Sequence, residues 1–128
     1  MMKIETVASR IVDGAIKVHR TLGPGLLESA YQKCFAYELE QAGSTVACEV
    51  ALPVHYGEVN INAGFRADMI VDGLVIIENK TVERIAPIHR AQLLTYLKIS
   101  GLNIGFLLNW NVPLMKNGIQ RMVHRLGQ

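Results

Sequence analysis

The stretch FRADMIVDGLVIIENK, residues 65–80, decides the fold of this 128-residue chain. Two apolar runs flank Asp72-Gly73, a pair that favours a tight turn between antiparallel strands. We therefore predict a β-hairpin with one strand over 65–71 and the other over 74–80. Both strands are apolar at nearly every central position, which is typical of strands covered on both faces of a sheet.

Charged residues end the second strand of this hairpin. Glu78 and Lys80 share one face of it because side chains alternate along a strand. Asp68 lies on the preceding strand, and a two-residue turn would place it opposite Ile77, on the face away from Glu78. For the two carboxylates to share a face, we predict a three-residue loop or a bulge near Gly73, where glycine permits a positive φ.

The rest of the chain predicts a mixed α/β domain. Apolar residues recur at helical spacing over 3–21 and 26–42, and Pro87 is well placed to begin a third helix that ends at Ser100. Further strands are predicted over 46–54, 59–63, 104–109 and 119–125, with Pro53 indicating an edge strand or a bulge. A helix between two strands implies that the two strands are parallel, so the predicted sheet is mixed and flanked by helices. We expect these elements to form one domain over residues 1–128.

Composition excludes several classes of protein. Apolar residues make up 50 % and charged residues 19 %, so the chain should fold. No apolar run approaches the ~18 residues of a membrane span, and the first residues lack the apolar stretch of a signal peptide. Cys34 and Cys48 are expected to be small buried thiols of a cytoplasmic protein. A mean hydropathy of +0.22 favours apolar surface hidden in an oligomer, such as a homodimer.

Charge is distributed unevenly along the chain. All 11 acidic residues lie within residues 1–83, whereas residues 84–128 contain six Lys or Arg and no acid. A segment of one sign is a candidate polyanion-binding surface, although a solvated basic face explains it equally well. We expect Arg90, Lys98 and Arg121 to border the carboxylates and, with Arg66, to contact nucleic acid.

Two acids and a lysine at the rim of a sheet can hold a hard divalent cation. Mg²⁺ accepts one or two protein carboxylates plus water, and a neighbouring lysine can orient water or stabilise charge on a phosphate. Taken alone, the spacing of Asp68, Glu78 and Lys80 is a weak signal. A surface salt bridge from Glu78 to Lys80 or Arg66 would explain it as simply.

Three further polar residues lie on helices near these strands. Gln92 and Tyr96 are one helical turn apart and share a face. Glu28 stands in the first turn of the second helix, where an acid complements the helix dipole or points inward beside Leu27.

These residues carry a resemblance to a known family. GLLESAY, residues 25–31, resembles the G-x-x-E-x-x-Y signature of the GxxExxY family, and FRADMIVDGLVIIENK, HRAQLLTYLK and GFLLNWN resemble its later blocks. The similarity runs from about Val12 to Val123. That family is grouped with the PD-(D/E)xK nucleases, whose restriction-endonuclease-like core is a helix, a three-strand meander, a crossover helix and a further strand.

The resemblance implies a nuclease that depends on Mg²⁺ or Mn²⁺ and acts on nucleic acid, DNA sooner than RNA. It implies that Asp68, Glu78 and Lys80 form the metal-and-catalysis trio and that Glu28 is an additional acid. The main-chain carbonyl of Asn79 would be another metal ligand. Gln92 and Tyr96 would be the Q-x-x-x-Y pair of the RecB-like exonuclease branch.

Three positions depart from the family pattern, one of them mildly, since Phe65 stands where tyrosine is more usual. Glu49 stands where glutamine is usual, and Asn79 stands where an apolar residue is commoner. The Asn79 side chain should face away from the site and need a buried hydrogen-bond partner. Two alternatives to an enzyme stay open: a non-catalytic nuclease-fold module that binds nucleic acid or protein, and a structural homo-oligomer whose carboxylates form salt bridges.

Overall fold

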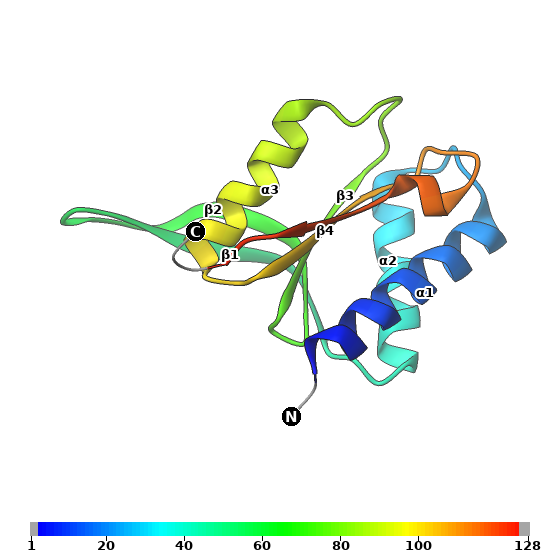
Figure 1. Ribbon diagram of the computed structural model, residues 1–128, viewed down its shortest axis with the longest axis horizontal. Helices are drawn as coiled ribbons and strands as arrows, with labels where there is room; N and C mark the ends of the chain where they lie inside the picture. The colour runs from blue at the N-terminus through cyan, green and yellow to red at the C-terminus, as the bar shows by residue number, and fades with distance from the viewer. Residues whose placement is uncertain (1–2, 126–128) are drawn as a thin grey trace.

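The order of helices and strands agrees with the order predicted from the sequence. A computed structural model describes residues 3–125 (Figure 1). The elements are α1 (Ile4–Leu22), α2 (Glu28–Gln41), β1 (Val46–Tyr56), β2 (Val59–Val71), β3 (Val75–Lys80), α3 (Pro87–Ser100), β4 (Ile104–Asn109), the 3₁₀ helix η1 (Met115–Gly118) and β5 (Ile119–Val123). Among these described residues, no helix is long and apolar enough to cross a membrane.

The strands form one mixed sheet in the order β1-β2-β3-β4-β5. Only β3 and β4 run parallel, joined through α3, and the other neighbours are antiparallel. Helices α1 and α2 pack on one face of the sheet and α3 on the other (Figure 1). The predicted mixed, helix-covered sheet is therefore confirmed.

Two apolar layers hold the helices on the sheet. On the first face, Phe35 and Trp110 are fully buried, and the Trp110 ring stacks on Tyr31 with ring centroids 5.0 Å apart. On the second face, Leu93 of α3 lies so close to Gly105 that a Cβ there would stand 2.9 Å from a Leu93 methyl carbon. A larger residue at position 105 would therefore require the Leu93 side chain to shift.

The loop between β2 and β3 has the predicted three-residue form. Val71 pairs with Val75, which leaves Asp72, Gly73 and Leu74 as the loop. Asp72 and Gly73 both have positive φ, 53° and 65°, and Asp72 Oδ1 accepts a hydrogen bond from the Thr45 backbone N–H at 2.9 Å. This register brings Asp68 opposite Glu78.

The β1–β2 hairpin extends well beyond the other strands as an arm over residues 51–66 (Figure 1). The predicted strand at 59–63 joins 65–71 in one strand. Pro53 lies on the edge strand at a register shift, since Leu52 pairs with Phe65 but Val54 with Ile61. Both predicted features of Pro53, the edge and the bulge, are thus present.

The expectation that both cysteines are buried is wrong. Cys34 and Cys48 are free thiols and both are exposed. Cys34 lies on a face of α2 that does not contact the sheet core, and Cys48 lies on the edge strand β1, which has a neighbour on one side only.

Candidate active site

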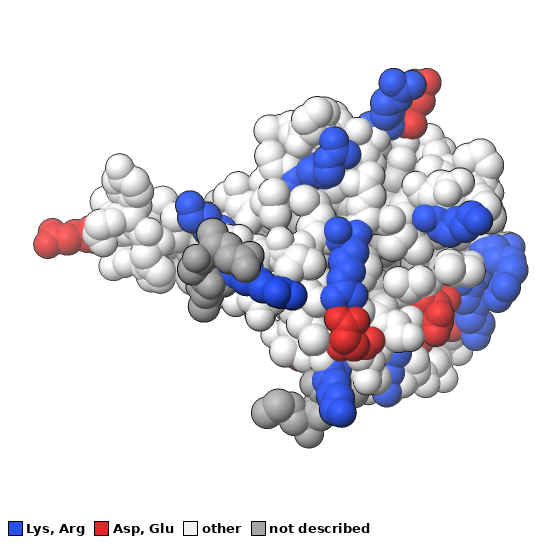
Figure 2. Space-filling model, viewed as in Figure 1, with Lys and Arg blue, Asp and Glu red and all other residues white. Residues whose placement is uncertain are grey.

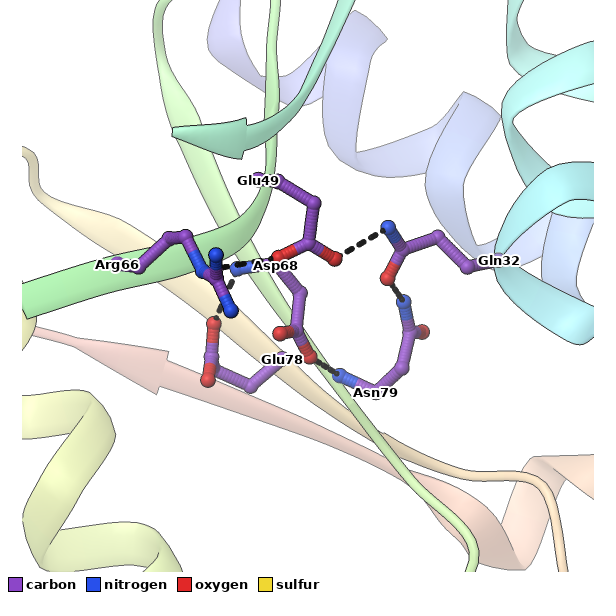
Figure 3. Close-up of polar contacts among 6 residues, drawn as sticks. All are labelled: Gln32, Glu49, Arg66, Asp68, Glu78 and Asn79. Carbon is purple, nitrogen blue, oxygen red and sulfur yellow. Dashed lines mark hydrogen bonds and ion pairs between the residues drawn. The ribbon is translucent and has the colours of Figure 1, made fainter. Parts of the chain in front are cut away.

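The site lies in a fork where β2 and β3 separate. Their antiparallel ladder stops at Met69 and Ile77, and the next residue on each strand is acidic. Glu78 Oε2 accepts a hydrogen bond from the Asp68 backbone N–H at 2.8 Å, and Asp68 Oδ2 accepts one from the Asn79 backbone N–H at 2.8 Å (Figure 3). Side-chain bonds therefore replace ladder bonds, which fixes both carboxylates in the fork.

Burial raises the pKa of both acids. Glu78 is only 4 % exposed, and desolvation, followed by the charge of Asp68, raises its pKa to about 8. Desolvation also raises the pKa of Asp68, against the opposing effect of the hydrogen bond from Asn79. Two carboxylates held this close cannot both carry a charge in a partly dry site without a compensating cation.

No salt bridge supplies that cation in the part of the chain that the structure describes. No Lys or Arg nitrogen lies within 4.0 Å of the carboxylate oxygens of Asp68 or Glu78. Arg66 instead pairs with Glu49 at 3.2 Å. The charge of Lys80 lowers the pKa of both acids, so Lys80 stands near them without contact. The simpler explanation of the motif, a salt bridge to Lys80 or Arg66, is therefore wrong.

Glu28 approaches the fork from α2. It is the first residue of that helix, and its pKa is raised by desolvation and then by the charge of Asp68, while Lys80 opposes the shift. The charges of Asp68 and Lys80 therefore act on the Glu28 carboxylate, so its role is not limited to complementing the helix dipole. Within residues 3–125, however, no three His, Cys, Asp or Glu side chains converge closely enough to enclose an ion as they stand.

Tyr96 closes the site from α3. Its ring stacks on Phe65 of β2 with centroids 4.4 Å apart. Burial raises the pKa of its hydroxyl first, and the charges of Glu78 and Asp68 raise it further. Gln92, one turn earlier, is exposed, and no hydrogen bond ties it to another described residue. The structure thus brings Tyr96 to the carboxylates and leaves Gln92 on the rim of α3.

Asn79 faces away from the carboxylates, as predicted, and its side chain is fully satisfied. Its Oδ1 accepts a hydrogen bond from Trp110 Nε1 at 3.0 Å, and its Nδ2 donates to Gln32 Oε1 at 3.0 Å. Gln32 Nε2 in turn donates to Glu49 Oε1 at 3.1 Å (Figure 3). These partners were not predicted from the sequence, although Gln32 stands one helical turn after Glu28, a spacing that puts both on one face of α2.

Of the basic residues expected to border the carboxylates, Arg121 lies elsewhere. Arg121 lies on β5, which β4 separates from β3, and it pairs with Glu5 of α1 through bonds of 3.1 and 2.6 Å. Around the α3 axis, Arg90 and Lys98 lie about 120° and 160° from Tyr96. Figure 2 shows Lys and Arg scattered over the visible face, with acidic side chains between them. The pairing with Glu5 therefore places Arg121 away from the carboxylates, contrary to the prediction, whereas the predicted border of Arg90 and Lys98 stays a prediction.

The carboxylates of the fork suit a divalent cation. Each carboxylate uses one oxygen to accept a hydrogen bond from a backbone N–H. The other oxygen, Oδ1 of Asp68 or Oε1 of Glu78, has no hydrogen-bond donor among the described residues. Mg²⁺ prefers oxygen ligands and keeps several waters, so one or two protein carboxylates suffice. The donor set therefore fits Mg²⁺ or Mn²⁺.

Comparison with known proteins gives the class of protein. The family model described as the PD-(D/E)XK nuclease superfamily matches residues 5–122, nearly the whole chain. The chain belongs to the PD-(D/E)XK nuclease superfamily, and its mixed five-stranded sheet between helices is the restriction-endonuclease-like fold. Neither a curated protein nor a solved structure matches it.

Proposed function

We propose that this protein is a metal-dependent nuclease that hydrolyses phosphodiester bonds in DNA. One observation carries the proposal: Asp68 and Glu78 are held together in a partly buried fork without a cationic partner among the described residues. Burying charge without compensation is costly. The two carboxylates are buried despite this unfavourable free energy, and each still has one oxygen without a hydrogen bond. A bound cation would compensate their charge and use these oxygens as ligands.

The chain supplies a distinct task for each residue of the fork. Asp68 and Glu78 would hold Mg²⁺ or Mn²⁺, with Glu28 and the main-chain carbonyl of Asn79 completing the set. Such an ion, when bound, neutralises charge on the phosphate and lowers the pKa of a water molecule. Lys80, which stands near the acids without pairing with them, would hold the scissile phosphate or orient the attacking water.

Contacts to the rest of the substrate come from residues beside the fork. Tyr96 can donate a hydrogen bond from its hydroxyl to a phosphate oxygen, because its raised pKa keeps the hydroxyl protonated. Gln92, on the same flank of α3, would contact the nearby DNA strand. Arg66, two residues before Asp68 on β2, is the basic residue that we assign to the DNA backbone.

We further propose that the chain is a member of the GxxExxY family within the RecB-like branch. The support is the run GLLESAY at the start of α2, the spacing of Asp68, Glu78 and Lys80, and the Gln92–Tyr96 pair on α3. The same resemblance favours DNA over RNA.

Cleavage assays test the proposed reaction directly. Labelled single- and double-stranded DNA and RNA are incubated with the protein and Mg²⁺, Mn²⁺ or EDTA. We expect DNA cleavage with Mg²⁺ or Mn²⁺, none with EDTA, and loss of activity in Asp68→Asn and Lys80→Met. Equal cleavage by wild type and both variants would reveal a contaminating nuclease, and no cleavage of any substrate would contradict the proposal.

A non-catalytic, homo-oligomeric role is the second candidate, and the β1–β2 arm favours it. An isolated two-stranded ribbon is marginally stable in water, yet this arm exposes Tyr56 by 79 %, together with Val59 and Ile61. Apolar side chains so placed suit a protein partner, such as a second copy of the chain. Sedimentation of the wild type and of Ile61→Lys tests this, since a homodimer built on the arm would dissociate in the variant.

A further inference from the structure

A directed chain of hydrogen bonds runs behind the fork. The indole N–H of Trp110 can only donate, so the Asn79 atom 3.0 Å from it must be the oxygen. The Asn79 amide nitrogen therefore points to Gln32 Oε1, and Gln32 Nε2 points to Glu49 Oε1. Trp110 thus sets the direction of each bond, from Trp110 through Asn79 and Gln32 to Glu49.

This chain joins the elements that build the fork. Trp110 directly follows β4, Asn79 lies on β3 between Glu78 and Lys80, and Gln32 lies on α2. Glu28, on the same helix face, stands one turn before Gln32. The backbone N–H of Asn79 also holds Asp68 Oδ2. A shift of Gln32 relative to Asn79 would therefore move Glu28 relative to Asp68 and Glu78.

Glu49, the last residue in this series of hydrogen bonds, has a strained backbone. Glu49 has a φ of 53° inside β1, and this backbone conformation is energetically unfavourable for any residue that has a Cβ. Both of its carboxylate oxygens are engaged, Oε1 by Gln32 and Oε2 by Arg66 (Figure 3). Asn79 is fully buried, Gln32 is half-buried and Glu49 is exposed, so only the inner end of this hydrogen-bonded series lies in the core. An apolar residue at position 79 would need no hydrogen-bond partner there. A buried amide at position 79 together with a strained residue at position 49 indicates a role in geometry.

We propose that Asn79 and Gln32 are positioning residues, which with Trp110 and Glu49 set the first turn of α2 against β3 so that Glu28 can join Asp68 and Glu78 around one cation. This inference rests on the proposed function. It assigns a purpose to Asn79 and Glu49, two of the positions where the chain departs from the pattern that it resembles.

Variants of Gln32 and Glu49 can separate geometry from charge. Gln32→Met removes the hydrogen bonds on both sides of this position without changing charge. In the pair Gln32→Glu with Glu49→Gln, net charge is that of the wild type, Asn79 still donates to position 32, and position 49 now donates to it. Both hydrogen bonds and the net charge are thus preserved with different side chains, although the bond between positions 32 and 49 runs in the opposite direction. Gln41→Met, at the exposed end of α2, is the matched control.

Two measurements follow the variants. The first is the Kd for Mn²⁺, by calorimetry. The second is the indole N–H signal in the proton–nitrogen NMR spectrum, which is unambiguous because Trp110 is the only tryptophan of the chain. We expect Gln32→Met to weaken Mn²⁺ binding about 10- to 100-fold, as loss of a residue supporting metal ligands does. The swapped pair and Gln41→Met should keep the wild-type Kd, and the indole signal should shift in Gln32→Met alone.

The outcomes distinguish this inference from the proposed function. If the wild type binds Mn²⁺ and Gln32→Met binds it equally tightly, Gln32 and Asn79 serve stability only and the inference fails while the function stands. A wild type that does not bind Mn²⁺ overturns both. Should Gln32→Met not fold, the swapped pair decides, because a folded swapped pair that keeps both hydrogen bonds but binds Mn²⁺ more weakly would show that these bonds do not set the geometry.

Discussion

Glu78 reaches across from β3 to the backbone N–H of Asp68, and Asp68 reaches back to the backbone N–H that follows Glu78, each at 2.8 Å. The two acids thus hold each other's strands at the point where the sheet opens. Because each bond uses one oxygen, the arrangement fixes the carboxylates and still leaves donor atoms for a ligand. The oxygens that hold the two strands together and the oxygens available to a cation are therefore different atoms.

Divalent ions should stabilise the fold. An ion that binds only the folded protein adds about 2.7 kcal/mol to the free energy of unfolding at ~100 times its Kd. For a domain of this size, that corresponds to a rise of roughly 8 to 15 °C in Tm. We expect this rise with Mg²⁺, Mn²⁺ and Ca²⁺, measured by thermal melting against EDTA. A Tm unmoved by millimolar concentrations of all three ions would argue for a structural role of the carboxylates.

Neutral variants of the two acids should melt higher than the wild type without metal. Asp68→Asn and Glu78→Gln remove the repulsion between the carboxylates, and each keeps an oxygen that accepts the backbone hydrogen bond seen at 2.8 Å. Both should lose most of the rise in Tm with metal. Glu58→Gln, in the exposed turn between β1 and β2, is the control and should behave as the wild type. Variants that melt lower in EDTA would mean that the charges stabilise the fork.

Stability without metal should fall as pH rises from about 4.5 to about 8. Burial and the charge of Asp68 raise the pKa of Glu78 from 4.5 to about 8, so the folded state holds a proton that the unfolded chain releases. The loss has a ceiling of about 5 kcal/mol, because each tenfold difference in proton affinity between the folded and unfolded states corresponds to about 1.4 kcal/mol. Urea unfolding in EDTA across this range should show the slope, and Glu78→Gln should flatten it. A wild-type stability that rises over the same range would contradict the buried position of Glu78.

The sequence predicts most of this fold because local rules govern it. Periodicity locates the helices and strands, and the need for Asp68 and Glu78 to share a face predicts the three-residue loop that the register shows. The partners of Asn79 are beyond such rules, because Gln32 and Trp110 are 47 and 31 residues away in the chain. Only tertiary packing brings these amides together.

Two separate considerations bear on the basic residues of segment 84–128. Arg121 pairs with Glu5 across 116 residues of sequence, which no local pattern reveals. The positions of Arg90 and Lys98, in contrast, follow from helical spacing, since both lie well away from Tyr96 around α3. Counting charges along a segment overlooks the face on which each charge lies.

Charge reversals should separate the basic residue beside the fork from those behind α3. Arg66→Glu, two residues from Asp68, should weaken DNA binding and reduce the slope of log affinity against log salt by about 0.7 to 0.9, the loss of one phosphate contact. Reversal of Arg90 and Lys98 together should leave both quantities unchanged, because these side chains leave α3 on the flank away from Tyr96. Fluorescence anisotropy with labelled DNA in Ca²⁺, at several salt concentrations, measures both. A larger loss from the α3 reversal than from Arg66→Glu would place the DNA across the outer flank of α3 and overturn the assignment of Arg66.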